Sequence, residues 1–177
     1  KIDTIYSPAG VQIFEQPFLI GDELLKLSLE ASVDMLRSLE PGIMSQLKQA
    51  TCLEILNGGK YYCVPEALKT VTGSVCQVSS LRAKRRLDES SGKWKVDVWE
   101  RTGPPIGDLQ GPLVIGDTIA TGTTLSGVLQ LVVEEMRQAD NFQDVVVITI
   151  AGASEAVSKQ LQPLDDALAG HGKSITI

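Results

Sequence analysis

The strongest constraint on the fold of this chain is one segment, residues 112–125, which reads Pro-Leu-Val-Ile-Gly-Asp-Thr-Ile-Ala-Thr-Gly-Thr-Thr-Leu. Its opening apolar run is typical of a strand that is buried on both faces of a sheet. From about Thr123, apolar residues recur at helical spacing as far as Met136, which predicts a helix. The segment therefore predicts a strand, a tight turn and a helix in succession.

The turn between this strand and this helix is suited to binding an anion. Backbone N–H groups at a helix start have no partner within the helix, and the helix dipole adds partial positive charge there. Residues 121–124 are therefore expected to form an anion cradle, in which Gly122 permits close approach of the backbone and the threonine hydroxyls add donors. Asp117, at the strand end, can accept from a hydroxyl pair or hold a hydrated Mg²⁺ ion. A ligand with a phosphate, a diol and a metal ion would fit.

Residues 114–125 resemble the phosphoribosyl diphosphate signature of the type I phosphoribosyltransferases, in which hydrophobic residues, two acids and a spacer precede Thr-Gly-x-Thr. Gly116 stands where that signature has its first acid, so the resemblance does not supply one contact to the ribose 3′-hydroxyl. Uracil phosphoribosyltransferases also lack this acid. A generic phosphate-binding turn in another doubly wound fold is the alternative. The residues that the resemblance implies for binding phosphoribosyl diphosphate here are Asp117, Thr118, Ala120, Thr121, Gly122, Thr123 and Thr124, with Mg²⁺ on Asp117.

A second glycine turn, Asn57-Gly58-Gly59-Lys60, follows an apolar run at residues 51–56. A double glycine between a strand and a helix exposes successive backbone N–H groups, which can form an anion-binding nest. Taken alone, Asn-Gly-Gly is more often a plain turn than a ligand site. Residues 56–62 resemble the Leu-Lys-Gly-Gly-Tyr-Lys-Phe pyrophosphate loop of hypoxanthine-guanine phosphoribosyltransferases, with Asn57 in place of the lysine. The resemblance implies diphosphate contacts from Asn57, Gly58, Gly59 and Lys60.

A charged stretch from Arg82 to Gly92 lies between the two glycine turns. It lacks apolar anchors that could offset the entropy of ordering, so it predicts a mobile loop. Residues 93–100 then alternate between apolar and polar, which predicts the returning strand of a hairpin over residues 82–100. A solvated surface turn is the ordinary interpretation of such a stretch. Its position is similar to that of the flexible loop that closes over the diphosphate in this family, which implies catalytic roles for Arg82, Lys84 and Arg85.

The rest of the chain continues the alternation of strands and helices. This order predicts one α/β domain over residues 1–177, with a mostly parallel sheet flanked by helices. Ligands of such sheets collect at the carboxyl ends of strands, and both glycine turns and the basic loop fall at or near such ends. The other predicted elements are an extended arm or hairpin at 1–20, a helix from Asp22 to about Leu39 stopped by Pro41-Gly42, strands at 51–56, 75–81, 144–151 and 173–177, and a helix capped by Ser154 that runs through Leu161.

Composition and motif content argue against several other classes of protein. The net charge of −6 disfavours general nucleic-acid or membrane-surface binding, and no apolar run approaches membrane-spanning length. The three cysteines lack Cys-x-x-Cys spacing, so we expect reduced thiols in a cytoplasmic protein rather than a metal site or a disulfide. His171 is the only histidine and lies between two glycines, where a surface loop is a better interpretation than a catalytic base. Walker and Gly-x-Gly-x-x-Gly motifs are both missing.

The resemblance implies a Mg²⁺-dependent transferase that moves the 5-phosphoribosyl group from phosphoribosyl diphosphate to a nucleobase or related nitrogenous acceptor and releases pyrophosphate. Such an enzyme would be a cytoplasmic homodimer of nucleotide salvage, with no nucleic-acid or membrane partner. Ala120 stands where 6-oxopurine enzymes carry an acid beside the base, so a pyrimidine or an unusual acceptor is preferred. The alternative is a non-catalytic protein of the same fold that holds phosphoribosyl diphosphate or a nucleotide as a regulatory signal.

Overall fold

A computed structural model describes residues 3–16, 18–56, 58–90, 92–119, 122–152 and 154–177 of the chain. Its helices are α1 (Pro8–Glu15), α2 (Gly21–Arg37), α3 (Pro41–Gln46), α4 (Val64–Thr72), α5 (Thr123–Gln138) and α6 (Ser154–Ala169). Its strands are β1 (Thr51–Leu56), β2 (Gln77–Asp88), β3 (Lys93–Thr102), β4 (Leu113–Gly116), β5 (Val145–Ile148) and β6 (Ile175–Thr176). Short 3₁₀ turns are η1 (Leu47–Gln49), η2 (Gly59–Tyr62) and η3 (Ile106–Asp108).

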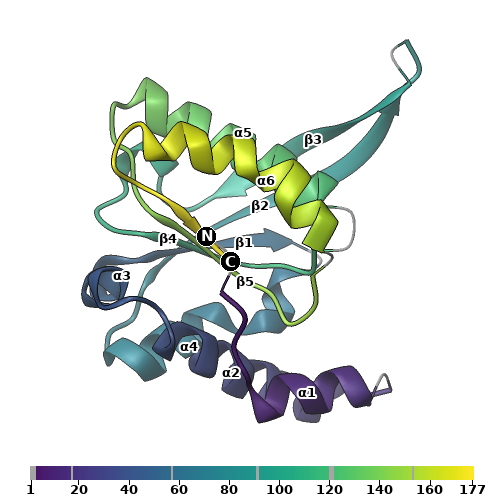
Figure 1. Ribbon diagram of the computed structural model, residues 1–177, viewed down its shortest axis with the longest axis vertical. Coiled ribbons are helices and arrows are strands. Elements are labelled where there is room, and N and C mark those ends of the chain that lie inside the picture. The colour runs from purple at the N-terminus through teal and green to yellow at the C-terminus, as the bar shows by residue number, and fades with distance from the viewer. Residues whose placement is uncertain (1–2, 17, 57, 91, 120–121, 153) are drawn as a thin grey trace.

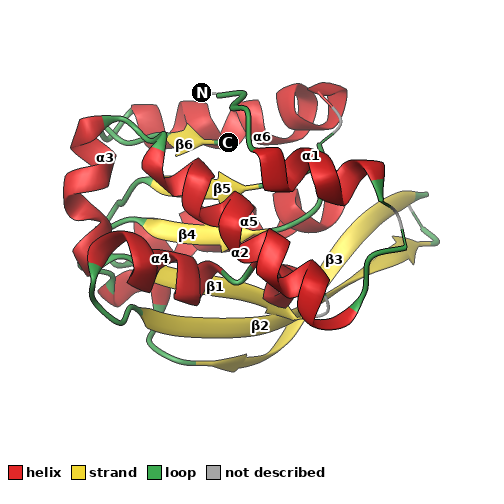
Figure 2. Cartoon of the chain, turned by 90° about the horizontal axis from the view of Figure 1, so that it is seen from below, coloured by secondary structure: helices red, strands yellow, loops and turns green. Residues whose placement is uncertain are grey.

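Within the described residues the strands form a single sheet in the order β3-β2-β1-β4-β5-β6. Neighbouring strands are parallel except β2 and β3, which form an antiparallel hairpin. Figure 1 and Figure 2 show that α5 and α6 cover one face of the sheet, whereas α2 and α4 cover the other. The mostly parallel α/β sheet flanked by helices, predicted from the sequence, is therefore confirmed.

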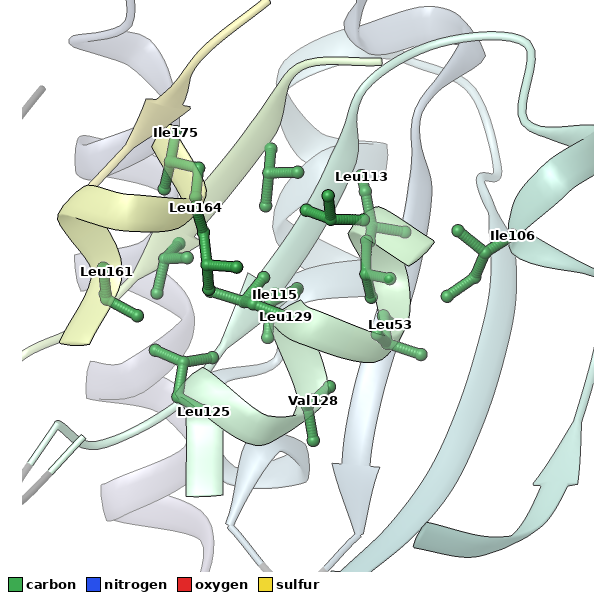
Figure 3. Close-up of a cluster of buried hydrophobic side chains, with 14 of the residues drawn as sticks. Leu53, Ile106, Leu113, Ile115, Leu125, Val128, Leu129, Leu161, Leu164 and Ile175 are labelled. Atoms are coloured by element: carbon green, nitrogen blue, oxygen red, sulfur yellow. The ribbon is translucent and has the colours of Figure 1, made fainter. Parts of the chain in front are cut away.

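The central strands are buried on both faces, as their continuous apolar sequences predict. On one face, Leu113 and Ile115 of β4 pack in a cluster with Leu125 and Leu129 of α5 (Figure 3). On the other face, Val114 belongs to a second cluster with side chains of α2 and α4. Alternate residues of β4 thus pack in the clusters on the two faces of the sheet. Because β4 is held from both sides, the residues that follow it have a fixed position.

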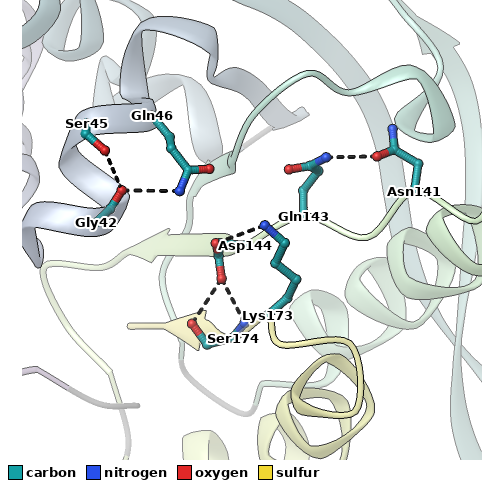
Figure 4. Close-up of polar contacts among 8 residues, drawn as sticks. All are labelled: Gly42, Ser45, Gln46, Asn141, Gln143, Asp144, Lys173 and Ser174. Atoms are coloured by element: carbon teal, nitrogen blue, oxygen red, sulfur yellow. Dashed lines mark hydrogen bonds and ion pairs between the residues drawn. The ribbon is translucent and has the colours of Figure 1, made fainter.

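Asp144, directly before β5, ties the short last strand to the sheet (Figure 4). Its Oδ1 accepts hydrogen bonds from the backbone N–H of Ser174 at 2.9 Å and from the hydroxyl of the same residue at 3.3 Å. Its Oδ2 lies 3.6 Å from the Lys173 Nζ. The predicted strand at 173–177 is present as β6, and these polar contacts reinforce its short ladder with β5.

Residues 8–15 form a helix within the N-terminal segment, which corrects the predicted extended arm or hairpin over residues 1–20. Pro8 begins α1, where its missing N–H removes no helical hydrogen bond. The Ser7 hydroxyl caps the helix by accepting from the Gly10 N–H at 3.3 Å, and it donates to Asp34 of α2 at 2.7 Å. Pro8 therefore starts a helix, and this helix packs on α2.

Three helix boundaries also differ from the prediction. Asp22 lies in the first turn of α2 instead of capping it, and Pro41 begins α3. α6 continues beyond Leu161 and through Pro163 to its end. Because Leu168 in the last turn is fully buried in the core cluster, packing offsets the cost of an internal proline.

The basic residues from Arg82 onward lie on β2, which corrects the predicted mobile loop. β2 continues to Asp88 and pairs with β3 in a hairpin that projects from the body of the protein (Figure 1). Acidic residues of β3 face the basic ones: the Arg82 Nε lies 2.6 Å from the Glu100 carboxylate, and the Arg86 Nε lies 2.9 Å from that of Asp97. These partners are distant in sequence, so the composition of β2 alone did not reveal the strand.

The cysteines Cys52, Cys63 and Cys76 are free thiols. Burial raises the pKa of each thiol above its ordinary value, which keeps these groups protonated and unreactive at neutral pH. Of the helices among the described residues, none combines the length and the apolar character needed to cross a membrane.

Candidate functional site

Segments that are far apart in sequence meet at the carboxyl ends of β1 and β4. The glycine turn after β1, the middle of β2 and the turn from β4 into α5 enclose a pocket of about 240 Å³, which we call the β1–β4 pocket. Neighbouring parallel strands end at the same edge of a sheet, and this brings the two turns together. The lining includes Gly58, Ala83, Arg85, Asp117, Thr118, Gly122 and Thr124.

The start of α5 forms one wall of the β1–β4 pocket. Gly122 caps the helix with φ of 72°, a left-handed conformation that favours glycine, and its carbonyl accepts a hydrogen bond from the Ser126 N–H at 2.8 Å. Among the described residues, no side chain caps this end of the helix. Gly122 and Thr124 line the pocket, so the partial positive charge of the first helical turn is directed at its interior. This wall suits an anion such as phosphate.

Asp117 is the only acid among the described residues that line the β1–β4 pocket. Its backbone N–H donates to the Ile148 carbonyl at 3.1 Å, so the backbone of Asp117 stays joined to β5 beyond the end of β4. Its Oδ1 accepts a hydrogen bond from the Thr118 N–H at 2.8 Å. Burial raises the pKa of the Asp117 carboxyl, and this hydrogen bond opposes the rise. Because a partly buried carboxylate is costly without partners, the position favours a cation or hydroxyl donors beside it.

The raised pKa of Asp117 predicts how stability depends on pH. When the folded-state pKa of an acid exceeds its unfolded value, about 3.9 for aspartate, the folded state holds the proton more tightly. The contribution of Asp117 to the free energy of unfolding is then present below the unfolded pKa and is lost as the pH rises through the folded pKa. In urea unfolding, we expect the advantage of Asp117→Asn over the wild type to grow between about pH 4 and pH 7. An advantage that stayed constant over this range would contradict the effect of burial.

Gly58 and Gly59 bring the turn after β1 against the end of β4. A Cβ atom on Gly59 would lie 2.8 Å from the Gly116 carbonyl oxygen, and a Cβ atom on Gly58 would lie 3.3 Å from the Asp117 Oδ1. Residues with side chains would push the two turns apart. The double glycine therefore has a packing role in closing the β1–β4 pocket.

Tyr62 occupies the space beside Gly116, the position where the resemblance has its first acid. A Cβ atom on residue 116 would lie 2.5 Å from the Tyr62 Cβ and 2.9 Å from the Val64 Cγ2, closer than side chains approach one another. The Tyr62 side chain is buried, and its hydroxyl lies 2.9 Å from the Thr118 Oγ1. The resemblance over residues 56–62 includes Tyr62 but assigned it no role in this site. The only signal of Tyr62 in the sequence is the Tyr-Tyr pair that follows the glycine turn.

Of the basic residues predicted to be catalytic, Arg85 lines the β1–β4 pocket, on the same face of β2 as Ala83. Its guanidinium carbon lies 6.0 Å from the centre of the Trp94 ring on β3. Strand alternation places Lys84 on the opposite face, and Arg82 is paired with an acid of β3. The structure therefore brings one of these three cations to the pocket.

Three other described residues that were proposed from the sequence, Gly59, Lys60 and Thr123, are not part of this lining. Lys60 is exposed on η2, and Thr123 lies half-buried in the first turn of α5. Asn57, Ala120 and Thr121 lie outside the described residues.

A metal ion in the β1–β4 pocket would find one carboxylate among the described residues, that of Asp117. Among the described residues, no group of three histidine, cysteine or acidic side chains is placed to hold one. The only histidine, His171, is not among the residues that line the pocket. Its ring stacks on that of Phe142, with 3.5 Å between ring centres. Mg²⁺ is commonly held by one or two carboxylates together with substrate phosphates and waters. Asp117 beside an anion-binding wall fits that donor set, with the remaining oxygens supplied by a phosphorylated ligand.

Comparison with family models and with curated protein sequences finds no match. Among solved structures, the chain is similar to a hypoxanthine phosphoribosyltransferase from Staphylococcus aureus at 14% identity and a TM-score of 0.47, over 71% of this chain and 61% of that one. It is similar to a purine phosphoribosyltransferase from Pyrococcus horikoshii at 16% identity and a TM-score of 0.41, over 73% of this chain and 74% of that one. A hypothetical protein from Neisseria gonorrhoeae with bound ppGpp is 12% identical, with a TM-score of 0.42, over 73% and 68% of the two chains. The chain thus spans less than two thirds of the staphylococcal protein, and at these identities the similarity concerns the fold alone.

Proposed function

We propose that the β1–β4 pocket binds phosphoribosyl diphosphate together with Mg²⁺, and that the protein transfers the 5-phosphoribosyl group to a nitrogenous acceptor. The observation that carries this proposal is the meeting of Asp117, Arg85 and the start of α5 in one pocket. The first turn of α5 suits the 5-phosphate, and Asp117 suits the ribose hydroxyls or the metal. Arg85 and the glycine turn that contains Gly58 suit the diphosphate.

The chemistry of such a transfer requires position and charge rather than a covalent nucleophile. The bond from the ribose C1 to the diphosphate oxygen breaks, and its electron pair leaves with pyrophosphate. The acceptor nitrogen forms the new bond to C1 and loses its proton to solvent. Arg85 stabilises the negative charge that grows on the leaving diphosphate, and Asp117 holds the sugar in place. When bound, Mg²⁺ supplies further neutralisation of that charge.

The proposed activity is tested by measuring pyrophosphate release from phosphoribosyl diphosphate and Mg²⁺ across a panel of nitrogenous bases. We expect at least one base to yield pyrophosphate and a phosphoribosylated product in equal amounts. Release that matches a reaction without protein for every base would contradict transfer.

Arg85 and Lys84 offer a matched test of which face of β2 meets the ligand. Arg85→Gln removes a cation from the lining, so we expect the affinity for phosphoribosyl diphosphate to fall about tenfold, the loss of one charge-assisted contact. Lys84→Gln makes the same change of charge on the opposite face, and we expect an affinity within about twofold of the wild type. Titration calorimetry at one ionic strength measures both variants. Equal losses would indicate a general effect of net charge and contradict a contact from Arg85.

A second candidate function is binding without turnover, in which phosphoribosyl diphosphate or a nucleotide acts as a regulatory signal. The packing of Tyr62 against Gly116 favours this candidate, because it leaves no room for the first acid of the signature. The two functions differ in one observable. A binding protein would take up phosphoribosyl diphosphate in calorimetry and release no pyrophosphate with any base.

A further inference from the structure

Tyr62 and Thr118 form a pair of hydroxyl groups beside the β1–β4 pocket. The Tyr62 Oη lies 2.9 Å from the Thr118 Oγ1, and Thr118 is exposed and lines the pocket. Thr118 directly follows Asp117, whose Oδ1 accepts a hydrogen bond from the Thr118 N–H at 2.8 Å. A ligand that is held at Asp117 would therefore meet the neighbouring hydroxyl as well.

This hydroxyl pair has hydrogen-bonding capacity to spare. Each hydroxyl group can donate one hydrogen bond and accept others through its lone pairs. When two hydroxyls bond to each other, the accepting group keeps its own proton for a further partner. Within the part of the chain that the structure describes, neither the Tyr62 nor the Thr118 hydroxyl makes another hydrogen bond. The pair can thus donate to a ligand hydroxyl and accept from one.

The Tyr62 side chain is held in one place by its surroundings. Its ring is buried and fills the space beside Gly116, where an added Cβ atom would lie 2.8 Å from the Tyr62 Cγ. The Tyr62 carbonyl accepts a hydrogen bond from the Ser32 hydroxyl at 2.6 Å, and Ser32 is fully buried on α2. A side chain that packing locks in this way can hold a neighbouring group in a defined direction. Tyr62 therefore orients the hydroxyl of the exposed Thr118.

We propose that Tyr62 is a positioning residue for the sugar: its hydroxyl orients that of Thr118, which then binds a ribose hydroxyl in place of the missing first acid. The packing that excludes an acid at Gly116 is the packing that brings the Tyr62 hydroxyl to this turn. Two neutral hydroxyls recognise the sugar without placing a second negative charge beside a diphosphate. This inference rests on the proposed binding of phosphoribosyl diphosphate, and it applies with or without turnover.

The test removes one hydroxyl at a time from the full chain. Tyr62→Phe keeps the ring, so the packing beside Gly116 is retained, and Thr118→Val removes the other hydroxyl. Tyr61→Phe is the matched control, because it makes the same change in the adjacent tyrosine, which does not line the β1–β4 pocket. Calorimetry with phosphoribosyl diphosphate and Mg²⁺ compares these variants and the double variant of Tyr62 and Thr118.

We expect Tyr62→Phe and Thr118→Val each to lower the affinity about fivefold, as for the loss of one neutral hydrogen bond. The double variant should also lose about fivefold, because both changes remove the same contact. We expect Tyr61→Phe to leave the affinity unchanged. Separate losses that multiply to about 25-fold in the double variant would overturn the positioning role.

A second measurement separates binding of the sugar from a structural effect. Ribose 5-phosphate and its 2-deoxy and 3-deoxy analogues compete with phosphoribosyl diphosphate. We expect Tyr62→Phe and the wild type to bind one of the two deoxy analogues equally well, because that analogue has no hydroxyl to meet the pair. Equal losses for all three sugars, or no loss for any, would overturn this inference alone. Failure of the wild type to bind phosphoribosyl diphosphate would overturn the proposed function, and this inference with it.

Discussion

Asp117→Asn weakens the binding of phosphoribosyl diphosphate and Mg²⁺ at least about tenfold, which corresponds to about 1.4 kcal/mol for one charge-assisted contact. Asp117 is the only acid among the described lining residues of the β1–β4 pocket, so no neighbouring carboxylate in that lining can replace it. The amide keeps the acceptor for the Thr118 N–H, and the local backbone is therefore retained. Calorimetry with the ligand in the presence of Mg²⁺ measures the loss.

The same substitution should raise the midpoint of thermal unfolding at pH 7. Burial raises the pKa of the Asp117 carboxyl, which means that its negative charge destabilises the folded protein at neutral pH when no ligand is bound. Asp140→Asn is the matched control, because Asp140 is exposed beyond the far end of α5 at a positive φ that asparagine tolerates. We expect this control to change neither affinity nor stability. Weaker binding combined with lower stability would indicate a disturbed fold instead of a lost ligand contact.

Gly116→Asp lowers the free energy of unfolding by about 3–4 kcal/mol, even though it restores the first acid of the family signature. The new Cβ atom would lie 2.5 Å from the Tyr62 Cβ and 2.8 Å from the Tyr62 Cγ, and the carboxylate would be forced into a buried position. Gly116→Ala introduces the clash without the charge, so we expect a loss of about 2 kcal/mol. Urea unfolding of the two variants separates crowding from the burial of charge.

Gly42→Ala is the control for these glycine substitutions. No heavy atom lies within 4 Å of a Cβ atom built on Gly42, which is in the first turn of α3. We expect no destabilisation and a gain of up to about 1 kcal/mol, since alanine favours a helix more than glycine does. Tolerance of aspartate at residue 116 would show that Tyr62 moves aside and that the site can accept the missing acid.

The sequence predicted those parts of the fold in which the local pattern and the packing agree. The apolar run before Asp117 is a strand buried on both faces, and the periodicity after it is α5. The α1 helix was missed because proline disfavours most helical positions, whereas Pro8 stands in the first helical turn, where proline is favoured. The hairpin was predicted as a loop at Arg82 because the acids that pair with β2 are on another strand. Contacts between distant residues leave no local pattern to detect.

The candidate site shows the same division between local and distant information. Motif order suggested that the glycine turn, the basic stretch with Arg82, Lys84 and Arg85, and the turn at Asp117 belong together. The structure places Gly58, Arg85 and Asp117 around one pocket. The role of Tyr62 depends on its contact with Gly116 across two elements, which spacing cannot reveal. Lys84 faces away from the pocket because side chains alternate between the two faces of β2. The sequence predicted a loop there, and a loop has no such alternation.

The most direct test is a crystal structure of the protein grown with saturating phosphoribosyl diphosphate and Mg²⁺. The expected result is ligand in the β1–β4 pocket, with the 5-phosphate on the first turn of α5 and the ribose or metal on Asp117. An ordered pocket that contains only solvent, or ligand bound elsewhere on the molecule, would contradict the proposed function.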